Sequence, residues 1–282
     1  MSYLKANFFS IDCLTNMLAG SGKANYGVID QLVQRDTSTK IPVIHASSLK
    51  GAVKEFCTHN NSLLEAGTIR KVFGSVKDNN NDTGTGQYKF LDAHLLLIPV
   101  RSDKRAYVHI TCPLVLENFA EHLTVFGKYN DAEKIKSFCK KVTNRDSRDE
   151  AWCFVPSLNE AVLEEFEFKA RIHNDISLYP DIKNILKDDF IITSDYIFKA
   201  LTNDLHLPVI ARNHLENGES ENLWYEQVIP SRSRFWFTLL SPVDENCGDF
   251  EDLLTANNSV IQIGANATVG YGYTKCNPIN LQ

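Results

Sequence analysis

The stretch that decides the fold is Ile41-Pro42-Val43-Ile44-His45-Ala46-Ser47-Ser48-Leu49-Lys50-Gly51. Its first four residues form an apolar run typical of a short β-strand. Leu49, Val53 and Phe56 then recur at helical spacing, which predicts an amphipathic helix. A strand that passes directly into a helix is therefore the first element pair that we expect.

The start of this helix is also a candidate ligand site. The first backbone N–H groups of a helix have no partner inside it, and they bind anions readily. Ser47 and Ser48 lie there, with Ser47 as the expected N-cap. Lys50 adds a positive charge, and Gly51 allows the backbone to approach a ligand closely. These residues predict a polyanion-binding site, and the alternative is a capped helix with an exposed lysine of no consequence.

A second glycine-dense segment, Ile263–Tyr273, lies near the end of the chain. Gly264, Gly270 and Gly272 allow a close approach of the backbone, and Asn266 lies between them. The alternative is a tight turn between two strands. Its two tyrosines belong either to the core or to a base-stacking surface.

Composition excludes several classes of protein. With 282 residues, 43% of them hydrophobic, the chain can bury a large core, and disorder is not expected. No apolar run approaches the roughly 20 residues that span a bilayer. The seven cysteines show no C-x-x-C spacing, so we expect reduced, mostly buried thiols rather than disulfides or structural zinc. The N-terminus does not resemble a signal peptide, and we expect a cytoplasmic protein.

Charge is unevenly distributed along the chain. The formal net charge is -6, which does not favour nucleic-acid binding over the whole surface. Residues 1–57, however, hold six Lys or Arg against four acidic residues, a local balance of +2. Residues 213–226 hold four glutamates and no Lys or Arg. A local basic groove on an acidic body fits a subunit of a nucleoprotein assembly, and it equally fits an ordinary enzyme.

Predicted helices and strands are mixed without strict alternation, which indicates an α+β fold. We expect a ferredoxin-like or RNA-recognition-type core as a single domain over residues 1–282. Large insertions are expected at about 14–40 and 74–87, and Asn217-Gly218 predicts a β-hairpin within about 203–228.

Ordered motifs in the chain resemble the RAMP superfamily of CRISPR-associated proteins. In chain order they are Gly27-Val28-Ile29-Asp30, Gln34-Arg35-Asp36, Ile41–Gly51, Phe90-Leu91-Asp92-Ala93, Leu95–Arg101, Thr111-Cys112-Pro113, Leu223–Glu226 with Pro230, and Gly264–Gly272. Each motif is weak alone, and the ordered set is fairly specific. Within the superfamily, the chain is most similar to the repeated backbone subunit of the type III-B (Cmr) effector complex.

The resemblance implies a modified RNA-recognition fold whose copies assemble along a CRISPR guide RNA, with other complex subunits as further partners and no membrane. Each copy would push a thumb hairpin through the guide–target duplex and cut the target RNA beside it at regular intervals. The ribose 2′-hydroxyl would be the nucleophile, and a divalent metal, Mg²⁺ or Mn²⁺, would be held jointly with RNA. Asp30 matches the aspartate on which cleavage depends, and it is the expected metal ligand.

The same resemblance implies roles for residues near the predicted hairpin. Tyr225 and Glu226 join Asp30 as catalytic candidates. The RNA-binding candidates are Arg35, Ser47, Ser48, Lys50, Gly51, Arg212, Gly264, Asn266, Gly270 and Gly272. The alternative for the hairpin residues is an ordinary solvated hairpin. The alternative for Asp30 is a turn or cap residue, because no paired carboxylate lies near it in the sequence.

Two departures from the family pattern leave other functions open. The family has His-x-Gly after its first strand, where this chain has Leu18-Ala19-Gly20. The family's Pro-Gly-Ser-Ser becomes His45-Ala46-Ser47-Ser48. The loss of the histidine predicts slower cleavage, and the extreme case is a non-catalytic guide-binding scaffold. An alternative from another class is a small-molecule enzyme with a phosphate site at Ser47–Gly51.

Overall fold

A computed structural model describes most of the chain. The described residues are 4–22, 27–60, 64–74, 84–142, 150–155, 158, 160–172, 179–187, 189–243 and 248–281. Contacts between residues divide the chain into two compact units. Unit 1 contains Met1–His94 and Pro208–Pro278, and unit 2 contains Leu95–Leu207 and Ile279–Gln282.

Unit 1 is built on an antiparallel sheet in the order β13-β14-β1-β12. Its strands are β1 (Leu4–Cys13), β12 (Arg234–Pro242), β13 (Ile261–Gln262) and β14 (Tyr273–Pro278). β1 lies between β12 and β14, so the N-terminal strand is held by two strands from the far end of the sequence. β12 is buried along almost its whole length, and Phe9 of β1 stacks on Phe237 of β12 with ring centroids 5.4 Å apart.

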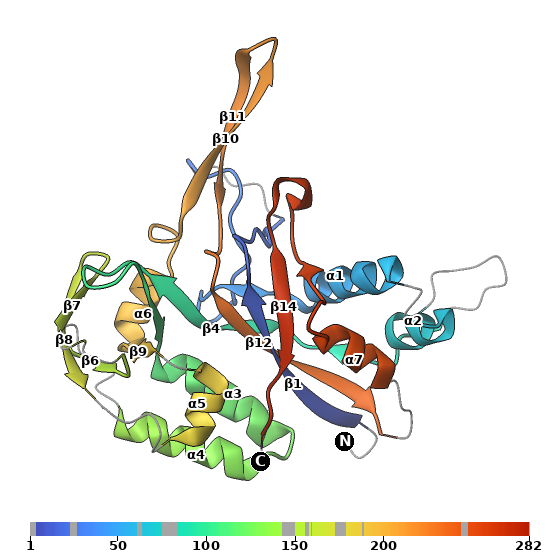
Figure 1. Cartoon of the computed structure of the whole chain (residues 1–282), viewed down its shortest axis with the longest axis horizontal. Coiled ribbons are helices and arrows are strands. Elements are labelled where there is room, and N and C mark those ends of the chain that lie inside the picture. The colour runs from blue at the N-terminus through green and yellow to red at the C-terminus, as the bar shows by residue number, and fades with distance from the viewer. Residues whose placement is uncertain are drawn as a thin grey trace. The chain divides into compact units, whose positions relative to one another are not determined.

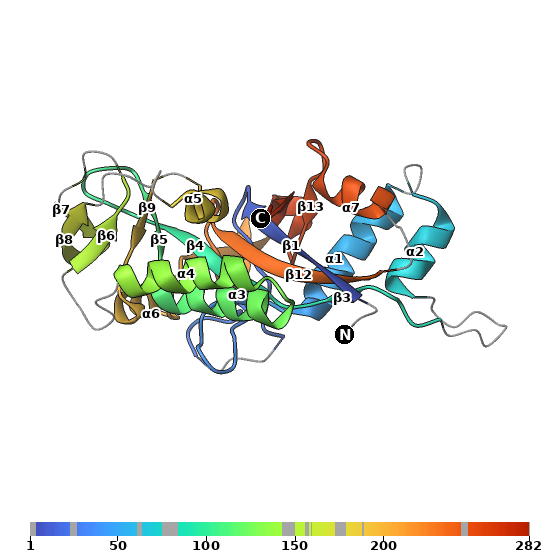
Figure 2. The same cartoon turned by 90° about the horizontal axis from the view of Figure 1, so that it is seen from below.

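Short strands and helices complete unit 1. β3 (Lys89–Phe90) pairs with β12, and β2 (Val43–Ile44) pairs with the first residues of β4 (Ala93–Val100). The helices are α1 (Ala46–His59), α2 (Ala66–Phe73) and α7 (Gly248–Thr255), and the short 3₁₀ helix η2 (Ala267–Val269) lies in the glycine segment. Figure 2 shows α1, α2 and α7 together beside the sheet.

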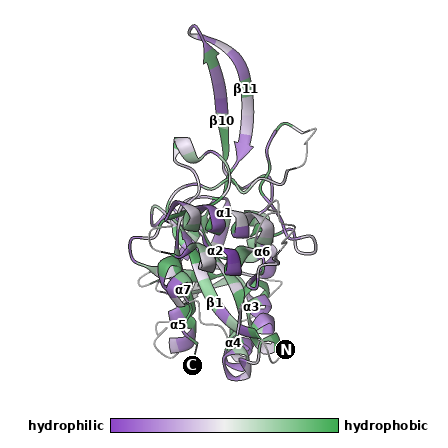
Figure 3. Ribbon diagram, turned by 90° about the vertical axis from the view of Figure 1, so that its right-hand side faces the viewer, coloured by the Kyte–Doolittle hydropathy of each residue, from purple (hydrophilic) through white to green (hydrophobic). Residues whose placement is uncertain are grey.

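A hairpin projects from unit 1 as a two-stranded sheet of its own (Figure 1). It consists of β10 (Val209–Glu216) and β11 (Glu219–Gln227). Asn217 and Gly218 form its turn with φ of 51° and 88°, the two positive values of a type I′ turn. The predicted hairpin is thereby confirmed, with longer strands than the sequence indicated. Figure 3 shows that β11 is largely hydrophilic, in keeping with its exposed outer part.

Unit 2 contains a mixed sheet and four helices among its described residues. The later part of β4 pairs with β5 (Val108–Thr111), and β9 (Phe190–Ile192) lies parallel to β5. β6 (Glu150–Cys153), β8 (Phe166–Ile172) and β7 (Glu160–Leu163) continue from β9 in that order. The helices are α3 (Pro113–Val125), α4 (Tyr129–Lys141), α5 (Pro180–Leu186) and α6 (Asp195–Leu201).

The structure confirms the α+β class, and it corrects two local predictions. The N-cap of α1 is His45 rather than Ser47, and the His45 side chain accepts no hydrogen bond from the helix. The apolar run from Lys89 to Val100 predicts one buried strand, but the structure has two, β3 and β4, with residues 91–92 between them. Residues 75–83 of the predicted 74–87 insertion lie outside the described residues. No helix in the described ranges is long and apolar enough to cross a membrane.

Candidate functional site

Asp30 lies against the base of the hairpin. Its backbone N–H donates to the carbonyl oxygen of Tyr225 at 3.0 Å, and the Tyr225 N–H donates to Asp30 Oδ2 at 2.8 Å. Two further hydrogen bonds follow, from Gln31 N–H to Tyr225 O and from Gln227 N–H to Gln31 O, at 3.2 and 2.9 Å. Asp30 is exposed, and its Oδ1 has no hydrogen-bond partner among the described residues. The site thus presents one carboxylate oxygen, at a position set by the backbone of β11.

Glu226, the neighbour of Tyr225, is buried. Only 2% of it is exposed, and its two carboxylate oxygens have separate partners. The indole N–H of Trp224 donates to Oε1 at 2.7 Å, and the side-chain amide of Asn266 donates to Oε2 at 2.8 Å. A buried carboxylate with both oxygens bound cannot reach a substrate in this conformation. The geometry therefore favours a structural position for Glu226 over the predicted action on the reacting atoms. Tyr225 is half-buried and meets Asp30 through its backbone.

Arg212 belongs to the same cluster. Its guanidinium lies 3.9 Å from Glu226 Oε2, and it stands over the rings of Trp224 and Tyr271 at 6.0 and 5.8 Å. The positive charge thus lies beside a buried negative charge, and aromatic faces stabilise it further. In this structure Arg212 joins β10 to the glycine segment. A contact between Arg212 and RNA stays a prediction.

Two glycines of the C-terminal segment are required by the protein's own packing. A Cβ on Gly264 would lie 2.3 Å from the carbonyl oxygen of Leu18, and a Cβ on Gly272 would lie 2.0 Å from that of Ile263. Both residues have positive φ, 92° and 75°. A Cβ on Gly270, which has φ 86°, would meet no atom within 4 Å. The tight-turn alternative therefore explains Gly264 and Gly272, and it leaves the surroundings of Gly270 open.

The start of α1 already carries an anion from the protein itself. Asp92 Oδ1 accepts the N–H of Ala46 at 2.7 Å, and its Oδ2 lies 3.4 Å from His45 Nδ1. Gln34, on the loop before β2, forms hydrogen bonds with residues at the start of α1. Its Oε1 accepts the His45 N–H at 2.7 Å, and its Nε2 donates to Ser48 Oγ and to the Gly20 carbonyl at 2.9 and 3.0 Å. Part of the predicted phosphate niche is thus filled.

The remaining residues of this niche are open. Ser47 and Gly51 are exposed, and a Cβ on Gly51 would meet no atom within 4 Å. Lys50 is half-buried and forms no ion pair with any residue that the structure describes. Arg35 lies on the same loop as Gln34, and its Nη1 donates to the Lys40 carbonyl at 2.7 Å. Phosphate contacts by Ser47, Lys50 and Gly51 remain sterically available.

Leu18 replaces the family's histidine with a fully buried side chain. Its carbonyl accepts the Ala265 N–H at 2.9 Å, so this position connects the N-terminal loop to the glycine segment. A leucine has no group that could transfer a proton. Sequence patterns did not point to Gln34, Asp92 or Trp224 as partners in these contacts. Trp224 had a signal, since it lies two residues before Glu226 and therefore on the same face of a strand.

The described residues do not build a metal cage. No group of three or more His, Cys, Asp or Glu side chains is placed to hold an ion in the ranges given above. At Asp30 the protein offers a single free carboxylate oxygen, and Glu226 offers none. The described residues therefore fit at most one protein ligand to a divalent cation.

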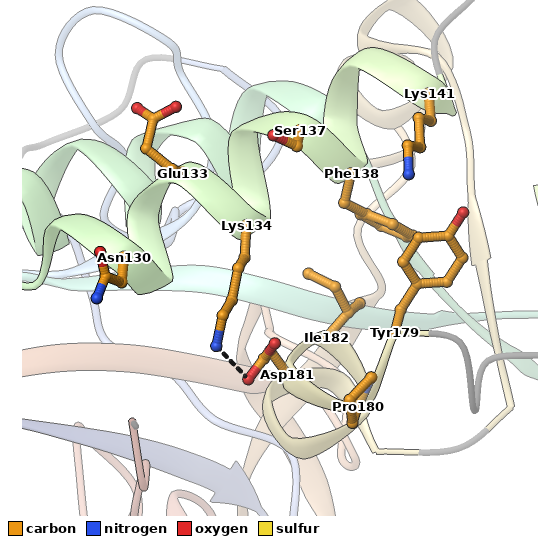
Figure 4. A pocket seen from close by; sticks show the side chains of 10 residues that line it. All are labelled: Asn130, Glu133, Lys134, Ser137, Phe138, Lys141, Tyr179, Pro180, Asp181 and Ile182. Carbon is orange, nitrogen blue, oxygen red and sulfur yellow. Dashed lines mark hydrogen bonds and ion pairs between the residues drawn. The ribbon is translucent and has the colours of Figure 1, made fainter.

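A separate hollow lies within unit 2 between α4 and α5 (Figure 4). It has a volume of about 520 Å³, and Lys134, Lys141 and Tyr179 lie in its wall. Lys134 is paired with Asp181 at 3.2 Å, and the Lys141 ammonium stands 5.6 Å from the Tyr179 ring. The hollow contains none of the predicted site residues, and its lysines have partners in the protein.

Comparisons with known proteins agree on one family. The RAMP superfamily model matches residues 10–275. A Pyrococcus furiosus protein named CRISPR system Cmr endoribonuclease Cmr4 is 30% identical in an alignment 291 positions long. The alignment covers 96% of this chain and 95% of that protein. A crystal structure of oligomeric Cmr4 from the same organism has 26% identity and a TM-score of 0.71, over 98% of this chain and 99% of that chain.

A further structure supports the fold. A chain in the cryo-EM structure of the type III-B Cmr-beta complex bound to cognate target RNA has a TM-score of 0.81 at 23% identity, over 98% of both chains. At that identity the likeness concerns the fold alone. The family model matches residues 10–275, which are most of the sequence. The chain belongs to the RAMP superfamily.

Proposed function

We propose that this chain is a backbone subunit of a type III-B CRISPR ribonucleoprotein that binds guide RNA and cleaves complementary target RNA at regular intervals. The single observation that carries the proposal is Asp30, an exposed carboxylate held by the backbone of Tyr225 at the base of a projecting hairpin. The full-length similarity to a protein named as an endoribonuclease supports the reaction class. Copies of the chain and other Cmr subunits are the proposed protein partners, which the structure of oligomeric Cmr4 supports.

The proposed chemistry is an internal transesterification. The target's 2′-hydroxyl oxygen attacks the adjacent phosphorus, the bond to the 5′-oxygen breaks, and a 2′,3′-cyclic phosphate and a 5′-hydroxyl form. Asp30 Oδ1 is the free oxygen that accepts the proton of the attacking hydroxyl. Water delivers a proton to the leaving oxygen, because Leu18 provides no acid at the position of the family's histidine.

A divalent cation, Mg²⁺ or Mn²⁺, is part of the proposal as an ion held mainly by RNA phosphates and water. Asp30 Oδ1 would either be the one protein ligand of this ion or accept the proton, and in the first case a water would accept the proton of the attacking hydroxyl. A single protein ligand is in keeping with the reluctance of Mg²⁺ to lose its waters. When bound, the ion would neutralise charge on the phosphate under attack. Removal of divalent cations with EDTA should then abolish cleavage and leave guide retention on the complex intact, as measured by the RNA that co-purifies. Unchanged cleavage in EDTA would remove the metal from the proposal.

The test is cleavage of labelled complementary RNA by the assembled complex, with wild type beside Asp30→Asn. The side-chain oxygen of the substituted asparagine can still accept the Tyr225 N–H, so the loop geometry is kept and only the charge is lost. We expect regularly spaced products from wild type and a loss of rate of about 100-fold or more in the variant, the range of general base catalysis. Equal rates in both proteins, at equal target binding, would refute the role of Asp30.

A second candidate is a guide-binding scaffold of the same or a related type III complex that does not cut. The observation that favours it is Leu18, a buried aliphatic side chain at the place of the family's histidine. This candidate predicts tight target binding with no products from wild type. The small-molecule enzyme is the weakest alternative, because Asp92 already occupies part of the anion niche that it would need.

A further inference from the structure

Asp30 is connected to the glycine segment through two adjacent residues of β11. Tyr225 holds the Asp30 carboxylate through its backbone N–H, at 2.8 Å. The next residue, Glu226, points its carboxylate to the Asn266 amide, at 2.8 Å. The position of Asp30 therefore depends on the base of β11, and the Glu226–Asn266 hydrogen bond joins the base of β11 to the glycine segment.

The geometry of Asn266 suits this connection. Its backbone is left-handed, with φ 64° and ψ 35°, a conformation that asparagine tolerates better than most residues. Its carbonyl oxygen accepts the N–H groups of Val269 and Tyr271, both at 3.2 Å. The turn that contains Gly270 is thus organised around the same residue that binds Glu226. Asn266 therefore contacts both this turn and β11.

A broken connection would leave a buried charge without compensation. Glu226 is almost fully buried, and its Oε2 has the Asn266 amide as its close donor, with Arg212 further away at 3.9 Å. An ionised carboxylate that loses a donor in such surroundings is strongly destabilised, so the strand base moves until the charge is solvated or paired again. Asp30, which is bonded to the adjacent residue of that strand, moves with it.

We propose that Asn266 and Glu226 are positioning residues for Asp30. Through them, the conformation of the glycine segment determines the position of the loop that carries Asp30. This inference rests on the proposed function. It assigns Asn266 to the control of Asp30 in addition to any contact with RNA, and it assigns Glu226 no contact with the reacting atoms. RNA seated on the turn at Gly270 would then stabilise the arrangement in which Asp30 is held.

An exchange of chemical groups between the two residues tests the proposal. Asn266→Asp places two carboxylates face to face and should slow single-turnover cleavage about 100-fold, the effect of a misplacement of about 1 Å. Glu226→Gln keeps the shape and can still pair with Asn266 after rotation of one amide, so its rate should stay within about threefold of wild type. The double variant restores an amide–carboxylate pair with reversed direction, and it should recover most of the rate.

The matched control is Asn277→Asp. Asn277 donates to Asp12 Oδ2 at 3.0 Å, in the same unit but on β14. This change also brings two carboxylates together, and we expect it to lower thermal stability while the cleavage rate of the folded protein stays near wild type. Loss of cleavage in both Glu226→Gln and the double variant would overturn the proposal, because it would indicate direct catalysis by Glu226. A normal rate in Asn266→Asp would overturn it as well.

A second readout does not depend on cleavage. Amide hydrogen exchange of Tyr225, whose N–H is bonded to Asp30, should accelerate about tenfold or more in Asn266→Asp and return toward wild type in the double variant. Unchanged exchange would refute the connection even if the complex did not cut RNA. Absence of cleavage by wild type, together with the expected exchange pattern, would instead refute the proposed function and leave the connection standing.

Discussion

The two glycine-bearing segments that the sequence marks as anion sites differ in what their glycines face. In the C-terminal segment, Gly264 and Gly272 lie against backbone carbonyls of the protein itself. At the start of α1, a Cβ on Gly51 would meet no atom within 4 Å, and the protein supplies the Asp92 carboxylate to the helix terminus. In the first segment the packing of the protein itself requires Gly264 and Gly272. At the start of α1, Gly51 and Lys50 are the positions that a ligand could still contact.

The comparison shows that one sequence signal has two physical origins. A glycine can be needed because its own Cβ would clash, or it can leave space for a ligand. Gly270 resembles Gly51 in this respect, since a Cβ on either would meet nothing within 4 Å. RNA contact in the C-terminal segment is therefore expected at Gly270 rather than at Gly264 or Gly272.

The largest expected effect separates these two origins by stability. Gly272→Ala forces a Cβ to within 2.0 Å of the Ile263 carbonyl, and we expect a loss of about 3 kcal/mol or more in the free energy of unfolding. Gly270→Ala, with positive φ but open space, should lose only about 1 kcal/mol. Urea unfolding followed by circular dichroism measures both. Equal losses would show that the two glycines have the same role.

The second effect concerns the anion at the helix start. Asp92→Ala removes the acceptor of the Ala46 N–H, and we expect a loss of about 1 kcal/mol in the free energy of unfolding, as for other capping residues. If phosphate competes for the same N–H groups, guide RNA should bind this variant more tightly at low salt. The control is Asp36→Ala, which removes a turn acceptor on the preceding loop. Stronger binding in both variants would indicate a general charge effect instead of competition at the helix.

Much of the fold follows from local patterns, and the site follows less well. The hairpin is predictable because Asn217-Gly218 suits the two positive φ angles of its turn. The strands β6, β7 and β9 are not, because they are only three or four residues long and their partners are distant in the sequence or unmarked by a turn signal. The N-terminus of α1 misleads in a similar way. Ser47 suits a cap, and yet the carboxylate that accepts the Ala46 N–H belongs to Asp92, 46 residues away.

The burial of Glu226 shows the same limit for the site. In the sequence it is one of four glutamates in an acidic stretch, and the motif that contains it gives no sign that its side chain is buried. Its partners Asn266 and Arg212 come from other segments, so its compensated, buried state exists only after folding. For Asp30, a polar loop position is evident from the sequence. Its attachment to Tyr225 could not be derived without the pairing between loop and hairpin.

The third effect tests whether Lys50 contacts phosphate. Lys50→Gln should weaken guide RNA binding for all sequences alike and lower the slope of log K against log salt by about one phosphate contact. Gly51→Ala is the companion variant: it should stabilise α1 by up to about 1 kcal/mol, because alanine favours helix, and weaken RNA binding if the backbone lies close to the ligand. An unchanged salt slope in Lys50→Gln would assign that lysine to the solvated surface.

The smallest expected effect is a pH dependence of the free energy of unfolding that arises from His94 on β4, beside the strand that precedes α1. Changes in the glycine segment should not alter this pH dependence. Burial lowers the pKa of His94, which stacks on Trp236 at 5.1 Å, and the nearby charges of Asp92 and Asp36 oppose this shift only in part. The unfolded chain therefore binds the proton more readily than the folded chain, at a pKa near 6.5. The stability contribution of neutral His94 is fully present above that pH, and it is lost as the pH falls toward the folded pKa. In His94→Gln the slope of the free energy of unfolding against pH should flatten, so the difference between wild type and variant should shrink from about pH 8 to about pH 5.

The control is Gly270→Ala, measured over the same pH range. It should keep the wild-type slope, because that change touches no group whose pKa is shifted. A slope that survives in His94→Gln would mean that the acid sensitivity of the fold arises elsewhere.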